Sequence, residues 1–143
     1  MAELRVEPDR PGENPPSFAG PTDDLVYFLS FAVAERYGAT HDLSGAARVL
    51  RERAAGDLLR PLLTFAEDNP ADADDRRDME QIWQEAAPVA SAARWAAEQI
   101  RDSRLLQGLT ADFPGLLPRL EDLAQIAAWW AERGARIRLL FRL

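Results

Sequence analysis

The stretch "ARIRLLFRL", residues 135–143, decides the fold class of this chain. Its apolar positions Ile137, Leu139, Phe141 and Leu143 alternate with Arg136, Arg138 and Arg142, which is the periodicity of a strand. Positions 137, 140 and 141 equally suit a helix that continues past Gly134. We favour the helix. The alternative is a short ribbon between the two termini, in which the acids of "ELRVE" (residues 3–7) pair with the arginines. A tail strand with an open edge could also pair with another chain.

Upstream of this tail the apolar periodicity predicts helices, at about 22–37, 43–55, 57–65, 70–106 and 113–133. The first helix is apolar on nearly every face, which is typical of the centre of a bundle. Pro88 lies deep inside the fourth helix and must kink or break it near Glu85–Ala87. Gly134 is expected to cap the fifth helix.

The fourth and fifth helices carry matching apolar rows. In the fourth, alternating steps of four and three connect Met79, Trp83, Ala86, Ala90, Ala93, Ala97 and Ile100. In the fifth, the row is Leu116, Leu120, Leu123, Ala127 and Ala131. Small alanines allow a leucine-rich partner helix to approach closely. The sequence therefore predicts an all-α, single-domain bundle of four to five helices, whose long Pro-kinked fourth helix pairs antiparallel with the fifth.

The N-terminal residues 1–21 are expected to form an arm outside the helical domain of residues 22–143. The stretch "PDRPGENPPSFAGP" (residues 8–21) holds half of the ten prolines, which favours an extended conformation. A mobile tail is the simpler interpretation. An arm that packs across the domain, anchored by Phe18, is the alternative.

Two tryptophans fall on helix faces that are otherwise polar. Neighbouring helical residues point about 100° apart, so Trp129 and Trp130 cannot share one narrow stripe. Trp130 is nearer the apolar row and is predicted to enter the core. Trp129 and Trp95 need a cover, either from another part of the chain or from a partner, since tryptophan is enriched at interface hot spots.

Composition narrows the possible functions. The chain has 143 residues, no cysteine, and a formal net charge of −7, which excludes disulfides and thiolate chemistry and makes nucleic-acid binding unlikely. All basic residues are arginine, as GC-rich coding favours, so a bacterial source is expected. No apolar run is long enough to span a membrane, and the N-terminus lacks the apolar core of a signal peptide. A cytoplasmic protein without membrane contact is expected.

Motifs for catalysis, metals or cofactors do not emerge. The single histidine, His41, is followed by Asp42 and Ser44, but these residues fit a helix start better than a catalytic triad. A calcium loop starting at Asp72 fails, because Arg77 and Trp83 stand where glycine and glutamate are needed. Glu98 and Asp102 have neighbouring arginines and are interpreted as surface ion pairs. No cofactor or metal is expected.

These observations favour a non-catalytic interaction or assembly module that self-associates as a homodimer or binds another protein. The expected interface residues are Trp95, Trp129, Arg136, Arg138, Phe141 and Arg142. One alternative is a bundle that binds a small apolar ligand in a pocket lined by Tyr27, Tyr37 and Trp83. A second alternative is a subunit of a nucleoprotein assembly that uses the arginines of the tail.

Overall fold

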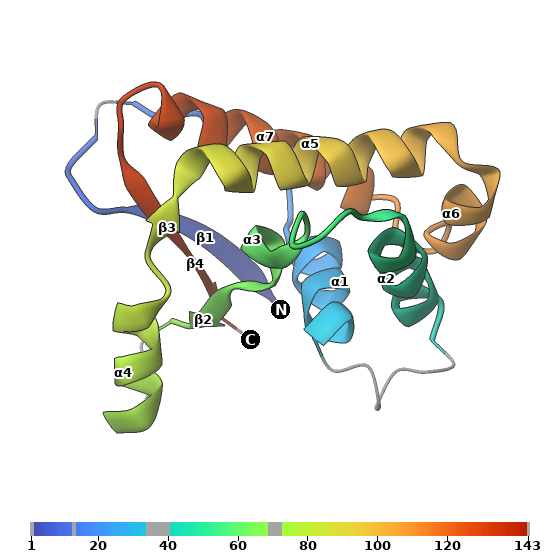
Figure 1. The fold of residues 1–143 in the computed structure, drawn as a ribbon, viewed down its shortest axis with the longest axis horizontal. Coiled ribbons are helices and arrows are strands. Elements are labelled where there is room, and N and C mark those ends of the chain that lie inside the picture. The colour runs from blue at the N-terminus through green and yellow to red at the C-terminus, as the bar shows by residue number, and fades with distance from the viewer. Residues whose placement is uncertain (1, 13, 34–40, 69–72, 143) are drawn as a thin grey trace.

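A computed structural model describes residues 2–12, 14–33, 41–68 and 73–142 (Figure 1). Eleven elements are assigned within these ranges. In chain order they are β1 (Glu3–Pro8), α1 (Asp23–Val33), α2 (Asp42–Arg53), α3 (Arg60–Leu63), β2 (Phe65–Glu67), α4 (Ala73–Gln81), β3 (Gln84–Glu85), α5 (Ala86–Asp102), α6 (Arg104–Leu109), α7 (Leu116–Ala131) and β4 (Arg136–Arg142).

The expectation of an all-α bundle is wrong, because the C-terminal stretch is a strand. β4 is the centre of a four-stranded mixed sheet, with β1 antiparallel on one side and β2 parallel on the other, and β3 pairs with β4 as well. The physical reason begins at Gly134, whose φ of 66° is the left-handed conformation that ends helices. The chain therefore leaves α7 there instead of continuing its helix.

The alternative to the helical tail, a ribbon between the two termini, is present in the structure. Glu7 lies opposite Arg138 and Glu3 opposite Arg142 in the antiparallel register of β1 and β4. The Glu7 and Arg138 side chains make an ion pair of 2.7 Å. Because both edges of β4 are paired inside the chain, the open edge expected of a tail strand does not exist on β4.

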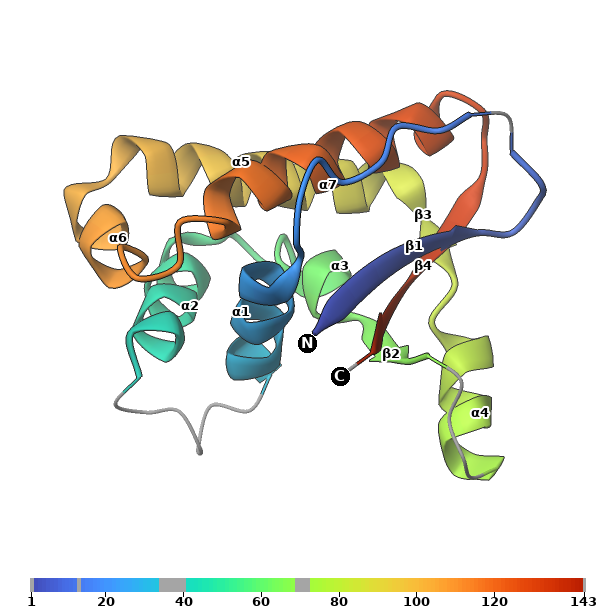
Figure 2. The same cartoon turned by 180° about the vertical axis from the view of Figure 1, so that it is seen from behind.

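The sheet buries one face against the helices. Leu4, Ile137 and Leu139 belong to the same core cluster as the buried residues of α1, α5 and α7, and Ile137 and Leu139 are fully buried. Figures 1 and 2 show α5 and α7 lying across one end of the sheet, while α1 and α2 stand below their other end. The opposite face of β4 is covered too, since Arg138 and Leu140 are buried as well, so the middle of the strand is buried on both faces.

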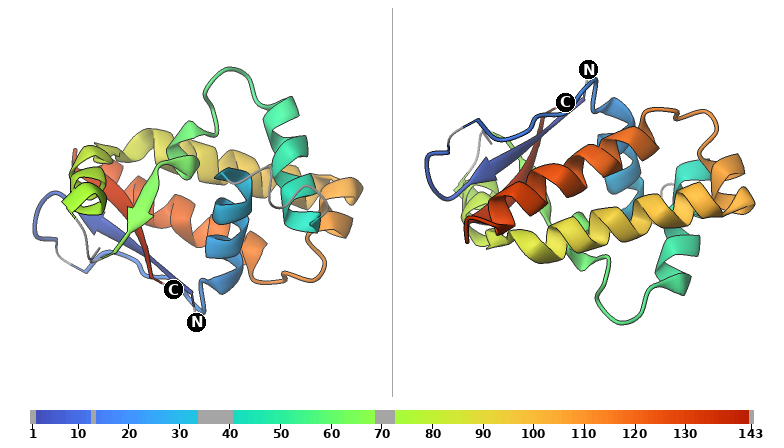
Figure 3. Two further views of the ribbon diagram at one scale, coloured as in Figure 1. Left: turned by 90° about the horizontal axis from the view of Figure 1, so that it is seen from below. Right: turned by 90° about the horizontal axis from the view of Figure 1, so that it is seen from above.

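Helices α5 and α7 pack side by side along most of their length, as Figure 3 shows from above. The alanine row from Ala86 to Ala97 and the leucine row from Leu116 to Leu123 are both buried, so the two predicted rows do form the seam. The predicted fourth helix is broken, however. Residues 82–85 leave the helix, which places Pro88 in the first turn of α5, where proline is tolerated. Met79 and Trp83 therefore lie outside the seam.

His41 has a structural role at the start of α2. Its Nδ1 accepts a hydrogen bond from the Leu43 N–H at 3.1 Å, which is the task of an N-cap side chain. Its ring stacks on Phe31 with 4.1 Å between the centroids. Asp42, which the sequence places at this helix start, is the first helical residue, and His41 before it is the cap.

Candidate binding cleft

The neighbouring tryptophans of α7 are both covered inside the chain. Trp130 is only 3% exposed, as predicted. Trp129 is half-buried and meets the Trp130 ring edge to face, with 4.8 Å between the centroids. The Arg133 guanidinium lies 3.4 Å from the centroid of the Trp129 ring, a cation–π contact. Arg133 therefore covers part of the Trp129 ring, for which the sequence did not identify a covering group.

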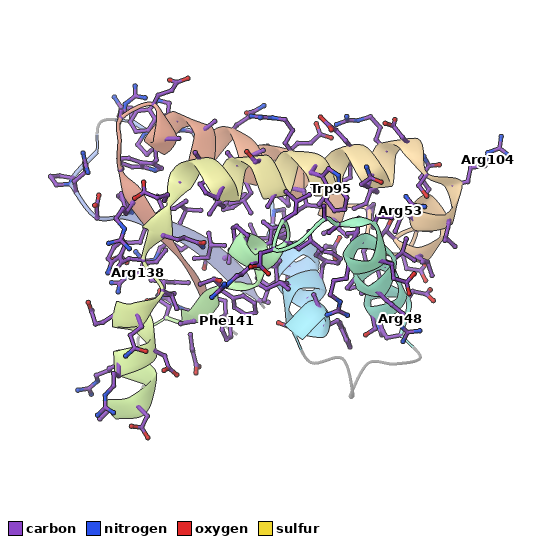
Figure 4. All side chains as sticks on the ribbon, viewed as in Figure 1. Arg48, Arg53, Trp95, Arg104, Arg138 and Phe141 are labelled. Atoms are coloured by element: carbon purple, nitrogen blue, oxygen red, sulfur yellow. The ribbon has the colours of Figure 1, made fainter. Side chains whose placement is uncertain are left out.

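Trp95 and Phe141 are also half-buried against the core. Figure 4 draws Trp95 below α5, on the side toward the segment that joins α2 and α3. The Phe141 ring makes an edge-on contact with Phe65 on the neighbouring strand, with 5.5 Å between the centroids. Trp95 and Trp129 lie on the neighbouring helices α5 and α7, and neither is fully exposed.

The three arginines of the tail bind groups of their own chain. Arg136 donates to the Trp83 carbonyl at 2.9 Å, and Arg142 donates to the Asp68 carboxylate at 3.2 Å. Arg138 is 7% exposed. Besides its ion pair with Glu7, it donates to the Met79 carbonyl at 2.9 Å, and its guanidinium lies 4.3 Å from the centroid of the Trp83 ring.

The residues predicted to line a ligand pocket are not brought together. Tyr27 is 40% exposed on α1. Trp83 lies between α4 and α5 beneath Arg138. Tyr37 falls outside the described residues. Neither Tyr27 nor Trp83 lines the hollow of about 740 Å³ that other parts of the chain form.

The part of the predicted N-terminal arm that lies outside β1, described for residues 9–12 and 14–22 and called the arm below, packs across the domain (Figure 2). Arg10 donates to the carbonyl oxygens of Arg133 and Gly134 at 3.2 and 3.1 Å, so it binds backbone acceptors just beyond the end of α7. Nearer α1, the Ala19 N–H donates to the Asp122 carboxylate at 3.0 Å. The arm is thus held near both of its ends.

Two contacts bring the middle of the arm onto the core. A Cβ atom on Gly12 would collide with the indole of Trp130, so only glycine allows the backbone to pass this close to the ring. Phe18 packs against the core cluster. The arm anchored by Phe18, our alternative to a mobile tail, is therefore the arrangement of the described residues.

Between the arm, the outer edge of β1 and α7 lies a hollow of about 740 Å³, which we call the arm cleft. This volume lies within the range of small-ligand sites, roughly 300–1,000 Å³. Apolar side chains make most of its wall: Ala2, Leu4, Val6, Pro8, Pro15, Pro16, Phe18, Pro21, Ile126 and Trp130. Sequence reasoning did not find this site, although the alternation in β1 and the Phe18 anchor were its local signals.

The polar groups of the arm cleft gather where β1 meets the beginning of α1. The buried Thr22 hydroxyl accepts a hydrogen bond from the Leu4 N–H at 2.8 Å, and the Asp23 carboxylate accepts from the Ala2 N–H at 3.2 Å. Glu3 and Arg5 also line this end. Arg5 is paired with Glu7 and Asp68, whereas Glu3 and Asp23 make no ion pair among the described residues. This end of the cleft is therefore negative.

Asp68 ties the two terminal strands together just behind this end. Its carboxylate lies 3.1 Å from the Arg5 guanidinium and 3.2 Å from that of Arg142. Burial raises the pKa of Asp68, but hydrogen bonds and charge from Arg5 and then Arg142 outweigh that effect, so the pKa lies below its ordinary value. Folding therefore favours the ionised form of this carboxyl.

We expect this carboxyl to contribute to acid sensitivity. Because its pKa is lower in the folded than in the unfolded chain, its stabilisation is present above the unfolded pKa, near pH 4, and is lost as the pH falls through the folded value. Asp68→Asn is expected to lower the urea midpoint at pH 6, and the difference from the unsubstituted chain should shrink toward pH 2. Asp57→Asn is the control, because its carboxylate is 82% exposed.

A constant difference between pH 6 and pH 2, or none at pH 6, would contradict this role for Asp68. Urea titrations followed by tryptophan fluorescence at several pH values measure it directly.

No group of three or more His, Asp or Glu residues within the described ranges is placed to hold a metal ion. In the same ranges, no helix is both long and apolar enough to cross a membrane. The arm cleft itself presents an apolar wall with hydrogen-bonding groups and negative charge at one end, an arrangement suited to binding.

Comparisons with known proteins give no match to this chain. No protein-family model matches the chain, and searches of curated proteins and of solved structures find no significant match.

Proposed function

We propose that this chain is a non-catalytic interaction module that binds its partner in the arm cleft. The observation that carries the proposal is the cleft itself, a hollow of about 740 Å³ with a mostly apolar wall. Burial of apolar surface stabilises an association by about 25 cal/mol per Å² removed from water. The floor is firm, because Ile126 and Trp130 are 4% and 3% exposed and belong to the packed face of α7.

The interface residues expected from the sequence support this proposal less well. Arg136, Arg138 and Arg142 bind acceptors of their own chain, and Trp129 lies beneath Arg133. A partner that used these groups would first have to break those contacts. Self-association as a homodimer stays a prediction, which native mass spectrometry at low micromolar concentration tests independently of the cleft.

The volume of the cleft also favours a second candidate, the binding of a small apolar ligand. The two functions share a site and differ in the occupant. A purified monomer that carries a constant extra mass in native mass spectrometry would favour the ligand.

The test of the site uses the dye 1-anilinonaphthalene-8-sulfonate on the full chain, followed by fluorescence and by ¹H–¹⁵N NMR. We expect saturable binding, with chemical-shift changes at the Val6 and Gly12 amides and at the Trp130 indole N–H. Val6→Thr keeps the branched shape but places a hydroxyl in the wall, and it should weaken the dye several-fold, since an unpaired buried hydroxyl costs about 1–3 kcal/mol.

Val49→Thr is the matched control, because Val49 is also half-buried against the core but lies on α2 and does not line the cleft. Shift changes centred instead on the exposed side chains Tyr27 and Leu105 would place the dye elsewhere and contradict the proposal. Absence of binding to the folded chain would contradict it too.

A further inference from the structure

The outer edge of β1 presents unpaired backbone groups to the arm cleft. In an antiparallel pair, residues alternate between those that exchange hydrogen bonds with the partner strand and those that point their N–H and C=O away from it. The Asp9 N–H donates to the Arg136 carbonyl at 2.9 Å, which sets the phase of the ladder. Glu7 and Arg5 therefore bond with β4, and Val6 and Leu4 point outward.

The structure blocks this outer edge at both ends and leaves it open at Val6. The outward N–H of Leu4 is bound by Thr22, and that of Ala2 is bound by Asp23. Pro8, at the other end of the strand, has no N–H to offer. Among the described residues the N–H of Val6 has no hydrogen-bond acceptor, and Val6 lines the cleft.

The arm lies opposite this open position and does not pair with it. Pro15 and Pro16 line the facing wall of the cleft, and proline cannot donate a backbone hydrogen bond. The N–H and C=O of Val6 therefore face an apolar hollow without a strand beside them. A purely apolar ligand would leave both groups unpaired, whereas an extended backbone supplies one acceptor and one donor at the right spacing.

We propose that the arm cleft takes an extended polypeptide segment, which adds to the edge of β1 at Val6 and directs an apolar side chain toward Ile126 and Trp130. This inference rests on the proposed function and names its partner class. Alternate residues of an added strand point to opposite faces. Only every second side chain of the bound segment therefore enters the cleft and affects its affinity.

Charge adds a preference for one end of that segment. Glu3 and Asp23 make the end of the cleft beside α1 negative, while the charge of nearby Arg5 is offset by Glu7 and Asp68. A Lys or Arg at the corresponding end of the bound segment would be favoured, and this attraction weakens as salt rises.

The experiment selects binders for the intact chain from a library of random linear peptides and then tests the selected peptide by backbone methylation. N-methylation of the residue that pairs with Val6 should weaken binding by about tenfold or more, because it removes a donor and adds a clash. Methylation of the neighbouring residue, whose N–H points away, should change the affinity little. Amide exchange at Val6 should slow in the complex.

Glu3→Gln should reduce the affinity of peptides with a basic end. Asp78→Asn is the charge-matched control, because it removes one negative charge on the exposed α4, away from the cleft. If the dye binds the cleft but no peptide does, or if methylation at either position has the same effect, the inference is overturned and the proposed function stands. If neither dye nor peptide binds, both fail.

Discussion

Leu139→Ala is expected to lower the free energy of unfolding by about 2–5 kcal/mol, the usual cost of removing a buried leucine from a core. Leu139 is fully buried, with 0% of its surface exposed to solvent. It lies in the central strand, opposite Val6 of β1 and Phe65 of β2. Alanine leaves a cavity in the core beneath the central strand. Since small domains are stable by roughly 5–15 kcal/mol, this is a large fraction of the total.

Urea unfolding followed by circular dichroism measures this loss. Arg142→Ala is the control in the same strand, because its side chain is 65% exposed and Asp68 keeps its ion pair with Arg5 when Arg142 is removed, so a loss of about 1 kcal/mol is expected. Equal losses for the two variants would mean that residues 136–142 do not form a buried central strand.

Arg138→Met should cost about 2–4 kcal/mol, because it removes a nearly buried guanidinium that pairs with Glu7 and leaves that carboxylate with only the more exposed Arg5 as a partner. The Arg138 side chain is 9% exposed and that of Glu7 is 25% exposed, and their ion pair measures 2.7 Å. The same guanidinium binds the Met79 carbonyl and lies over Trp83. One side chain thus joins β1, β4 and the segment between α4 and α5.

A double-mutant cycle separates the ion pair from the rest. Glu7→Gln alone and Arg138→Met alone each break the pair, so the double variant should be more stable than the sum of the two losses predicts, by about 1–2 kcal/mol. Arg142→Met serves as the control for the loss of an arginine from β4. Additive losses would show that Glu7 and Arg138 are not coupled. They would contradict the claim that this ion pair helps to hold β1 against β4.

The helical seam could be predicted because its signals are local. The alanine row of α5 and the leucine row of α7 repeat at helical spacing, and Trp130 falls beside the second row, so each position carried its own evidence. The end of α7 near Gly134 could be predicted equally well, because glycine commonly ends helices. Pro88 indicated the break, although the chain leaves the helix a few residues earlier and forms β3.

The tail could not be decided locally. Ile137 and Phe141 fit both a strand and a helix, and the choice depends on Leu4 and Val6, which lie at the other end of the sequence. The arm cleft could not be predicted locally either, for the same reason: it depends on residues that are far apart in the sequence. Its wall combines β1, the arm and α7, and nothing in the sequence alone shows that Gly12 passes over Trp130 or that Thr22 closes part of the β1 edge.

The central claim is that the C-terminal stretch pairs with the N-terminal one, and NMR of the ¹³C,¹⁵N-labelled chain tests it most directly. Facing residues of a pair that exchanges no hydrogen bonds have Cα atoms only about 4.5 Å apart. The register predicts Hα–Hα cross-peaks between Val6 and Leu139 and between Leu4 and Phe141, with strand-type chemical shifts over 136–142. Helical shifts over 136–142 without those cross-peaks would contradict the sheet, the outer edge of β1 and the cleft built upon it.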